Sequence, residues 1–334
     1  MPPRSEAKTG QRFNLSIKRF DFLTFQLSRF SFLISAVHQK FRTLLILGRV
    51  SNLPTVWSNC LAGWWLSCFS TDGQFVPDRS YYWKLPLLLL GTSALYIGGM
   101  FLNDAFDVDF DRQRRSTRPI PSGAIAEEWV WVYGWAWIAF GVLLLIFCGK
   151  WAGALAVVLA ICIIIYDATH KVITASPWLM GLCRFWVYVI AGTIGQGDYN
   201  GRPIWSGAAL AFYIVGLSYL ARRESLVSGR ARISWSSLIL LAAPILLAML
   251  MNTGSFRKPA IYLSIVLVCW IIRCVRTLFF GGEVAVVRIV SGLLAGIVIV
   301  DWLAIAPQCP FALGIIFALL FVATLLAQRF IPAT

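Results

Sequence analysis

Charged side chains are scarce in this chain. They make up 13% of its 334 residues, whereas 59% of the residues are hydrophobic; charged residues in an ordinary soluble domain reach about 25%. The mean hydropathy is +0.74. This composition excludes an ordinary soluble domain and predicts a protein that crosses the membrane several times.

Histidine is also rare, and cysteine, although it occurs eight times, never forms a CxxC pair. The cysteines are scattered, mostly through apolar stretches, so we expect small buried side chains and neither a zinc site nor a disulfide framework. The alternation of lumen-facing and lipid-facing residues that is typical of a transmembrane β-barrel is missing too. Helices are therefore the expected membrane-spanning elements.

Ten apolar stretches are present, several of them shorter than the ~20 residues of a normal span. We therefore expect an all-α, polytopic transmembrane bundle of nine to ten spans. The stretches are 52–70, 83–103, 127–148, 151–166, 177–196, 205–221, 235–251, 259–278, 284–305 and 311–328. Residues 1–43 are expected to form either a basic N-terminal arm or a targeting segment, and the sequence is compatible with both interpretations. Residues 44–334 are expected to form a single transmembrane domain.

Basic residues give the chain a net charge of +14, but their distribution does not suggest a nucleic-acid partner. With ten spans, 22 of the 29 lysines and arginines fall at the N-terminal side and at the ends of even-numbered spans, and six fall on the other side. Arg184 lies within a span. Such an excess marks the cytoplasmic, matrix or stromal face.

The densest polar cluster follows the second apolar stretch, where Asn103, Asp104, Asp107, Asp109 and Asp111 occur within nine residues. On a continuous helix, Asn103, Asp107 and Asp111 stack on one face, with Asp104 beside them and Asp109 opposite. A carboxylate near hydrocarbon costs about 2.5–3.5 kcal/mol on insertion scales, which a bound cation can offset. Oxygen ligands of this kind suit Mg²⁺, which shares its remaining positions with water and phosphate. The run therefore predicts a Mg²⁺ and diphosphate site.

Three polar loops fall on the basic side, after the second, fourth and sixth stretches. The first continues from the acidic run with four arginines, of which Arg112 and Arg118 are candidates to bind phosphate oxygens. The second contains Tyr166, Asp167, His170 and Lys171, and the third contains Arg222, Arg223 and Glu224. The first two loops predict a site that combines acids with cations. The third loop, taken alone, is typical of a solvated positive-inside loop. Because it lies on the same side as the acidic run, it is also a candidate part of the site.

The pattern Asn103-Asp104-x-x-Asp107-x-x-x-Asp111, followed by Arg118-Pro119-Ile120-Pro121-Ser122-Gly123, resembles the first aspartate-rich motif of the UbiA superfamily of intramembrane prenyltransferases. The resemblance runs over roughly residues 44–251. It implies a helical bundle around a central cavity, capped by cytoplasmic loops. It also implies that the chain binds an isoprenoid diphosphate through Mg²⁺ and transfers the prenyl group to a small acceptor within the membrane.

The resemblance and the residue chemistry together give a set of site predictions. The predicted metal ligands are Asn103, Asp104, Asp107, Asp111 and Glu224. The predicted diphosphate-binding residues are Arg112, Arg118, Lys171, Arg222 and Arg223. The predicted catalytic residues are Asp167, His170 and Lys171, the first two as acceptors of the proton released after alkylation. The predicted acceptor-binding residues are Arg49, Asn52, Asn59, Tyr166 and Arg184. Candidate aromatic side chains of the cavity wall are Trp64, Trp65, Phe101, Trp186 and Tyr188, with plain packing or lipid contact as the alternative for each.

The third loop departs from the family pattern, because the second motif of the superfamily, DxxxD, is replaced by Arg222-Arg223-Glu224-Ser225. A second Mg²⁺ held by fewer ligands, arginines that replace it, and loss of activity all remain open. Asp167 could supply the missing carboxylate if the ends of the fourth and sixth spans face each other. A membrane terpene cyclase and a non-catalytic or transport protein on the same scaffold remain alternatives to a transferase.

Overall fold

The computed structural model describes residues 38–69, 74–75, 82–195, 201–226, 235–252, 254, 257–276 and 283–333, with only the backbone at 223–226 and 283–286. It divides into two compact units, Met1–Leu45 and Ile46–Thr334. Of the first unit, residues 38–45 are described and are helical. The expected arm or targeting segment otherwise lies outside the described residues.

The second unit is built from helices. In chain order they are η1 (Val50–Asn52), α2 (Leu53–Ser67), α3 (Lys84–Phe106), α4 (Val108–Arg114), α5 (Glu127–Cys148), α6 (Lys150–Thr169), α7 (Ser176–Ile194), α8 (Arg202–Leu226), α9 (Trp235–Met251), α10 (Arg257–Val275), α11 (Glu283–Ile305), η5 (Ala306–Gln308) and α12 (Phe311–Phe330). Within the described ranges, β-structure is limited to an isolated bridge between Phe69 and Phe75. The all-α prediction is confirmed.

Each predicted apolar stretch corresponds to one long helix. Within the described part of the chain, eight helices are long and apolar enough to cross a membrane. The two shorter ones are α9, with 17 residues, and α2, with 15. The predicted number of nine to ten spans agrees roughly with these lengths, and the chain is a multi-pass integral membrane protein.

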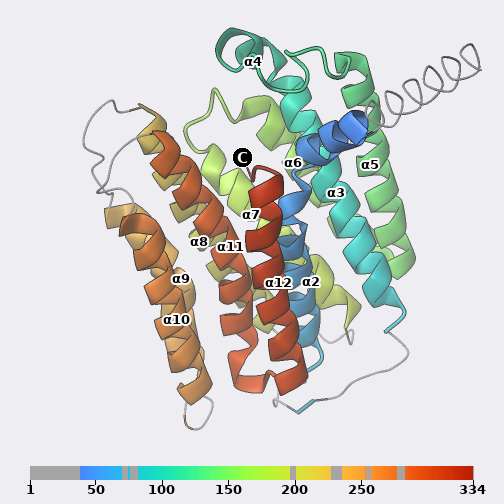
Figure 1. Ribbon diagram of the computed structural model, residues 1–334. Helices are drawn as coiled ribbons and strands as arrows, with labels where there is room; N and C mark the ends of the chain where they lie inside the picture. Colours follow the sequence, from blue (N-terminus) through green and yellow to red (C-terminus); the bar gives the residue numbers. More distant parts are fainter. Residues whose placement is uncertain are drawn as a thin grey trace, which may run out of the picture. The chain divides into compact units, whose positions relative to one another are not determined.

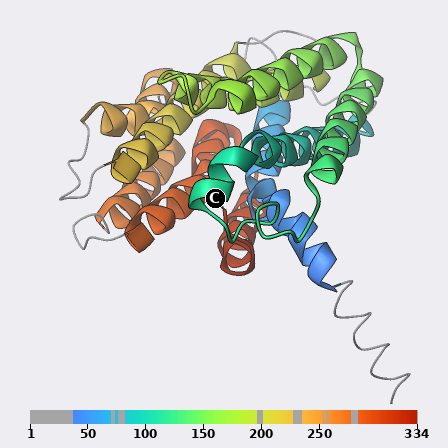
Figure 2. The ribbon, with the colours of Figure 1, turned by 90° about the horizontal axis from the view of Figure 1, so that it is seen from above.

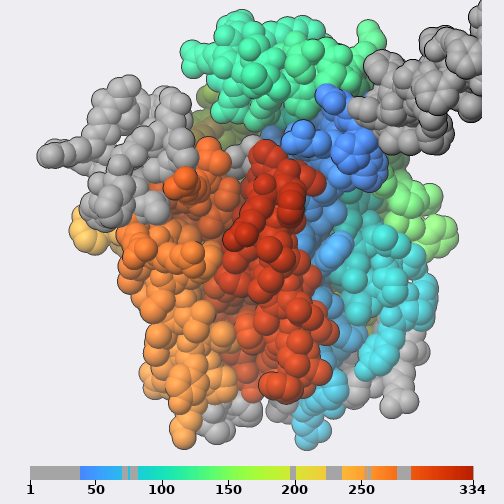
Figure 3. All heavy atoms as spheres, viewed as in Figure 1, coloured from blue at the N-terminus to red at the C-terminus, as the bar shows by residue number. Residues whose placement is uncertain are grey.

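The helices differ in how much of their surface is buried inside the bundle. In the apolar stretch that α11 contributes, within Val287–Gln308, 67% of the residues are buried, whereas only 17% are buried in that of α12. Helix α11 packs against α2, α8, α10 and α12. In the space-filling view, α12 covers the front of the bundle between α10 and α2 (Figure 3). Large apolar side chains such as Trp129, Phe147 and Phe311 are exposed. An apolar exterior of this kind suits a lipid environment.

Helix α3, which carries the acidic run, packs closely against α5. A Cβ atom added at Gly98 would lie 2.9 Å from the backbone oxygen of Gly134 on α5, and one added at Gly141 would lie 2.7 Å from the oxygen of Gly91. Glycine at these positions lets the two backbones approach closely. The short helix α4 follows α3 at one end of the bundle (Figure 1). Viewed from above, α4 and the C-terminal end lie near the centre of that end (Figure 2).

Candidate active site

The acidic run spans a break between two helices. Helix α3 ends at Phe106, and Asp107, with φ −87° and ψ −3°, precedes α4. Helical hydrogen bonds continue across the break, because the amide nitrogens of Asp107 and Asp111 donate to the carbonyl oxygens of Asn103 and Asp107, at 3.0 and 2.9 Å. The break has an electrostatic benefit: carboxylates are unfavourable at a helix C-terminus, but Asp109 and Asp111 lie in the first turn of α4.

Two arginines from different segments hold Asp104. The guanidinium of Arg49 lies 3.0 Å from Asp104 Oδ1, and that of Arg118 lies 2.8 Å from the same atom. Arg49 also donates to Asn103 Oδ1, at 3.2 Å. Its backbone is left-handed, with φ +42°, a conformation that costs a non-glycine residue about 1–3 kcal/mol and often marks a functional site. Arg49 and Arg118 therefore lie directly on the acidic motif.

The next two acids have cationic neighbours as well. Lys171 Nζ lies 2.7 Å and His170 Nε2 lies 3.4 Å from Asp107 Oδ1, while Arg118 lies 3.3 Å from Asp111 Oδ2. The loop after α6 and the loop after α4 thus meet at the acidic motif. Basic residues of the first two polar loops therefore lie beside these carboxylates.

Burial and pairing shift the pKa values of these groups in different directions. Burial raises the pKa of Asp107, but hydrogen bonds from His170 and Lys171 outweigh it and leave the value below the usual range. Burial would lower the pKa of His170, but the contact with Asp107 outweighs it and raises the value. At Asp111, burial raises the pKa and Arg118 offsets it only in part. The charged forms of Asp107 and His170 therefore stabilise each other.

Asp167, on α6, completes the cluster from a third direction. Asn103 donates from Nδ2 to Asp167 Oδ1 at 3.1 Å, and both residues are buried. The second oxygen, Asp167 Oδ2, is buried and has no hydrogen-bond partner among the described residues, and the same is true of Asp111 Oδ1. Buried carboxylate oxygens without a donor are costly unless a cation or a ligand satisfies them.

The donor set fits Mg²⁺ in its chemistry. Among the described residues, no three His, Cys, Asp or Glu side chains are close enough to hold one ion. Mg²⁺ seldom requires such a cage, because one or two carboxylates together with waters and substrate phosphates complete its shell. The two orphaned oxygens of Asp111 and Asp167, beside Asp107 and Asn103, supply ligands of the appropriate type.

Arg222, on α8, points at the loop that follows α6. Its guanidinium donates to the backbone oxygen of Thr174 at 3.0 Å, to that of Ile173 at 3.4 Å and to that of His170. The ends of α6 and α8 therefore face each other. This was the condition for Asp167 to supply the carboxylate that the third loop lacks. These contacts of Arg222 support the loop, and its predicted role in binding diphosphate remains a prediction.

Other predicted residues lie away from the cluster or outside the described side chains. Arg112 pairs with the exposed Asp109 and with Glu127, at 3.4 and 3.1 Å, and its side chain is 55% exposed. It thus faces away from Asp107 and Asp111. The side chains of Arg223 and Glu224 lie outside the described part of the structure, so their predicted roles stay predictions.

A cavity of about 400 Å³ lies next to the acidic cluster. Six of the predicted catalytic and acceptor-site residues line it: Arg49, Asn52, Tyr166, Asp167, His170 and Arg184; Arg222, predicted to bind diphosphate, lines it too. The remaining wall is mostly apolar and comes from α2, α3, α6, α7, α8 and α11. Tyr166 stacks on His170, with ring centroids 5.2 Å apart. None of the five aromatic residues expected in the wall lines this cavity, where Tyr96 and Tyr166 supply the aromatic rings instead.

Sequence reasoning missed Asp301, a fully buried acid on α11. Tyr188 donates to Asp301 Oδ1 at 2.6 Å, and Asn59 Nδ2 donates to Oδ2 at 2.7 Å, with Ser58 as a third donor. Arg184 donates to Asn59 Oδ1 at 2.7 Å. The only signal in the sequence was an acid within an apolar run, because its partners lie 113 to 243 residues away.

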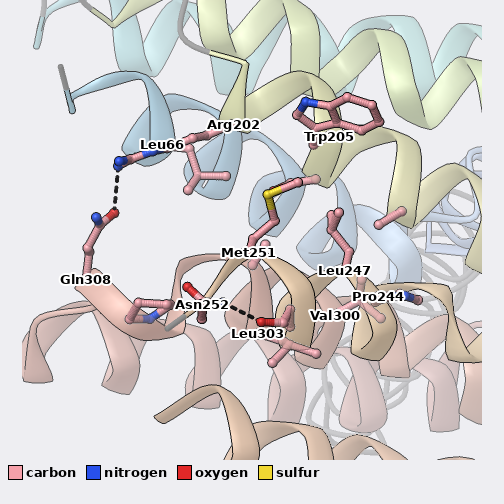
Figure 4. A pocket seen from close by; sticks show the side chains of 15 residues that line it. Leu66, Arg202, Trp205, Pro244, Leu247, Met251, Asn252, Val300, Leu303 and Gln308 are labelled. Atoms are coloured by element: carbon pink, nitrogen blue, oxygen red, sulfur yellow. Dashed lines mark hydrogen bonds between the residues drawn. The ribbon is translucent and has the colours of Figure 1, made fainter. Parts of the chain in front are cut away.

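A second cavity, of about 360 Å³, lies between α2, α8, α9 and α11. Figure 4 shows Arg202 and Gln308 pointing toward each other at its edge, with the nitrogen of Arg202 donating to Gln308 Oε1 at 3.2 Å. The wall near Met251 and Leu303 is apolar. None of the predicted site residues lines this cavity.

Fold and site together define a multi-pass helical membrane protein with an acidic cluster at one end of a largely apolar cavity. The chain belongs to the UbiA prenyltransferase family, whose model matches residues 54–280. The family assignment from the acidic motif is confirmed.

The chain is also similar to individual proteins. A digeranylgeranylglyceryl phosphate synthase from Ignicoccus hospitalis is 35% identical over 79 residues, which cover 24% of this chain and 26%, about a quarter, of that protein. A solved structure from a study of digeranylgeranylglyceryl phosphate synthase in membranes has a TM-score of 0.53 at 18% identity, over 87% of this chain and 99% of that one. A UbiA homolog from Archaeoglobus fulgidus, solved with GPP and Mg²⁺, has a TM-score of 0.42 at 15% identity, over 86% and 99%.

Proposed function

We propose that this protein transfers a prenyl group from an isoprenoid diphosphate to a small acceptor within the membrane, in a reaction that depends on Mg²⁺. One observation carries the proposal: acids from α3, α4 and α6 meet basic residues at one end of a largely apolar cavity. The apolar cavity suits a prenyl chain, and the charged residues at its end suit the diphosphate group. The positive-inside distribution of lysine and arginine supports a cytoplasmic, matrix or stromal location for this end.

The leaving group is the first task of the site. Breaking the bond between the allylic carbon and the diphosphate oxygen leaves a carbocation and pyrophosphate. Mg²⁺ would be held by Asp107 and Asp111 together with waters and phosphate oxygens, and would neutralise the developing negative charge. Asp167, fixed by Asn103, would add a further carboxylate beside this site. Arg118 and Lys171 already contact these carboxylates, so they lie within reach of phosphate oxygens bound there.

The second task is to direct the carbocation to the acceptor. The largely apolar wall excludes water, which would otherwise trap the cation, and Tyr96 and Tyr166 offer aromatic faces to it. The acceptor nucleophile forms the new bond to the prenyl carbon and then loses a proton. Asp167 and His170 line the cavity and are the candidate acceptors of that proton.

Pyrophosphate release tests this proposal. Purified protein in detergent would receive geranyl, farnesyl or geranylgeranyl diphosphate, with membrane extract as the source of acceptor. We expect release with Mg²⁺, none with EDTA, and a loss of at least about 100-fold in Asp107→Ala, because a metal ligand contributes several kcal/mol of charge stabilisation. Mass spectrometry of the lipid products separates transfer to an acceptor from cyclisation.

Asp109→Asn is the matched control, because Asp109 belongs to the same acidic run but its side chain is 88% exposed. This variant should release pyrophosphate at the wild-type rate. Folded wild-type protein that releases none from any of the three diphosphates would contradict the proposal, as would release that Asp107→Ala leaves unchanged.

A further inference from the structure

The segment that follows α12 reaches the wall of the cavity beside the acidic cluster. Its first residue, Ile331, has an extended backbone, with φ −128° and ψ 118°, as expected for a residue that precedes proline. Pro332 is exposed, whereas Ala333 is only 4% exposed and lines the cavity. The segment Ile331–Ala333 therefore lies at the boundary between the cavity and the surroundings of the protein.

Helix α12 brings this segment to the polar end of the bundle. It follows α11 through η5 and returns to the end that carries α4 (Figures 1 and 2). On the way it packs on α2, on α11 and on the short helix η1. The neighbouring part of the cavity wall comes from Val56 on α2 and from Val290 and Leu294 on α11. The last helix thus covers the side of the cavity that α2 and α11 form.

Asn52 holds the segment in place. This residue is 3% exposed and donates from Nδ2 to the backbone oxygen of Ala333 at 3.0 Å. Gln328, on α12, donates from Nε2 to Asn52 Oδ1 at 3.3 Å. Asn52 Nδ2 also donates to the hydroxyl of Tyr96 on α3, at 3.3 Å. One buried amide thus connects α12 and the segment after it to α3.

The rest of α12 is buried less than the other long helices. In its apolar stretch 17% of the residues are buried, the smallest share among the eight candidate spans in the described part of the chain. Elements with little buried apolar surface open at a lower free energy than the core of a protein. The two hydrogen bonds that join Asn52 to Ala333 and Gln328 therefore act as a latch on the segment.

Closure at this place matters for a reaction through a carbocation. A water molecule that reaches the allylic carbon forms a bond from its oxygen to that carbon and loses a proton. The product is then a prenyl alcohol and not a prenylated acceptor. A closed site prevents such hydrolysis of a reactive intermediate. The methyl group of Ala333 adds apolar surface to the wall, and Asn52 satisfies its backbone oxygen.

We propose that the segment Ile331–Ala333, latched to Asn52, closes the cavity against water and thereby decides between prenyl transfer and hydrolysis. Gln328 acts through Asn52 and is a positioning residue. This inference rests on the proposed function, and it assigns control over the fate of the carbocation to a part of the chain outside the acidic cluster.

The ratio of the two products tests the inference. The protein receives geranylgeranyl diphosphate, Mg²⁺ and membrane extract in heavy-oxygen water, and mass spectrometry measures the heavy prenyl alcohol formed per pyrophosphate released. Alcohol from the carbocation carries heavy oxygen, because water adds to carbon. A contaminating phosphatase cleaves the bond between phosphorus and oxygen, so its alcohol keeps ordinary oxygen. Asp107→Ala supplies the background.

Two variants open the latch. Gln328→Leu removes one hydrogen bond to Asn52 and should raise the heavy alcohol per pyrophosphate about 2- to 10-fold, the range for one lost hydrogen bond. A chain that stops after Phe330 should raise it at least as much. Gln308→Leu is the matched control, because it also removes one side-chain hydrogen bond, to Arg202 at the second cavity (Figure 4). It should leave the ratio unchanged.

Each outcome supports or overturns the inference. An unchanged ratio in Gln328→Leu and in the shortened chain overturns it and leaves prenyl transfer standing, even if their melting temperatures fall, because the segment then serves stability alone. An equal rise in Gln308→Leu also overturns it, since any loosening of the bundle would then admit water. If the shortened chain does not fold, Gln328→Leu decides. If the wild type releases no pyrophosphate, the proposed function fails, and this inference fails with it.

Discussion

Asn103 donates from Nδ2 to Asp167 Oδ1 across 3.1 Å, and this bond joins the acidic motif of α3 to the lone acid of α6. The two residues are 64 positions apart in the sequence. Because the second oxygen of Asp167 has no partner among the described residues, the bond fixes one oxygen and leaves the other facing a cation or a ligand. We propose that Asp167 supplies part of the acid that the third loop lacks.

Asp167→Asn tests this relationship. The substitution keeps the shape of the side chain and an oxygen that accepts from Asn103, but it removes the charge. We expect pyrophosphate release to fall at least about 100-fold, the lower end of the contribution of an acid–base group. Release is measured at saturating geranylgeranyl diphosphate and Mg²⁺. A rate equal to that of the Asp109→Asn control would assign the metal and proton roles elsewhere.

Removal of metal should abolish activity without unfolding the protein. Asp104 is paired with Arg49 and Arg118, Asp107 with Lys171, and Asp111 with Arg118, so cations of the chain itself offset the repulsion between the acids. We therefore expect the melting temperature in EDTA to lie within about 3 °C of that in Mg²⁺, a difference of about 1 kcal/mol.

As a comparison, the melting temperature is also measured with both Mg²⁺ and geranylgeranyl diphosphate added. A ligand at 100 times its dissociation constant stabilises the folded state by about 2.7 kcal/mol, so a clear rise in melting temperature should appear only with both present. Loss of folded protein on addition of EDTA alone would show that the ion pairs cannot replace the metal.

Arg222 should act through the loop that it supports. It donates to the backbone oxygens of Ile173 and Thr174 and to that of His170, next to Lys171. Arg222→Gln should lower stability by about 1.5–3 kcal/mol, the range for hydrogen bonds to a charged group, and should slow pyrophosphate release. Arg222→Lys should restore only part of both, because an ammonium group does not reproduce the planar fork.

Melting temperature and pyrophosphate release are measured on the same preparations. Arg112→Gln is the control, since Arg112 is also an arginine on the polar end of the bundle but is 55% exposed. It should leave both quantities unchanged. A variant of Arg222 that melts like the wild type but no longer binds geranylgeranyl diphosphate would instead support direct contact of Arg222 with the diphosphate.

The sequence predicted what local patterns determine. Runs of apolar residues predicted the ten longest helices, and the resemblance of the pattern Asn103–Asp111 to a known motif predicted the family. Contacts between distant segments could not be obtained in this way. Asp301 was missed because Ser58 and Asn59, which donate to it, precede it by 243 and 242 residues. Tyr188, expected in the wall, instead donates to Asp301.

The last prediction concerns the close contact that places α3. A Cβ atom at Gly98 would lie 2.9 Å from the backbone oxygen of Gly134, and also 2.9 Å from the backbone nitrogen of Ile138. Backbone atoms cannot move aside as a flexible side chain can, so Gly98→Ala should force α3 away from α5 and destabilise the protein by about 1–3 kcal/mol. Because Asn103 and Asp104 lie on the same helix, pyrophosphate release should fall as well.

Gly201→Ala is the matched control for this change. Among the described residues, a Cβ atom at Gly201 would meet only the side chain of Trp205, at 3.5 Å, which is an ordinary van der Waals distance. Its melting temperature should equal that of the wild type, whereas that of Gly98→Ala should fall by several degrees. Equal melting temperatures for the two variants would mean that α3 and α5 can separate at little cost, and then the contact at Gly98 would not be what holds the acidic motif beside Asp167.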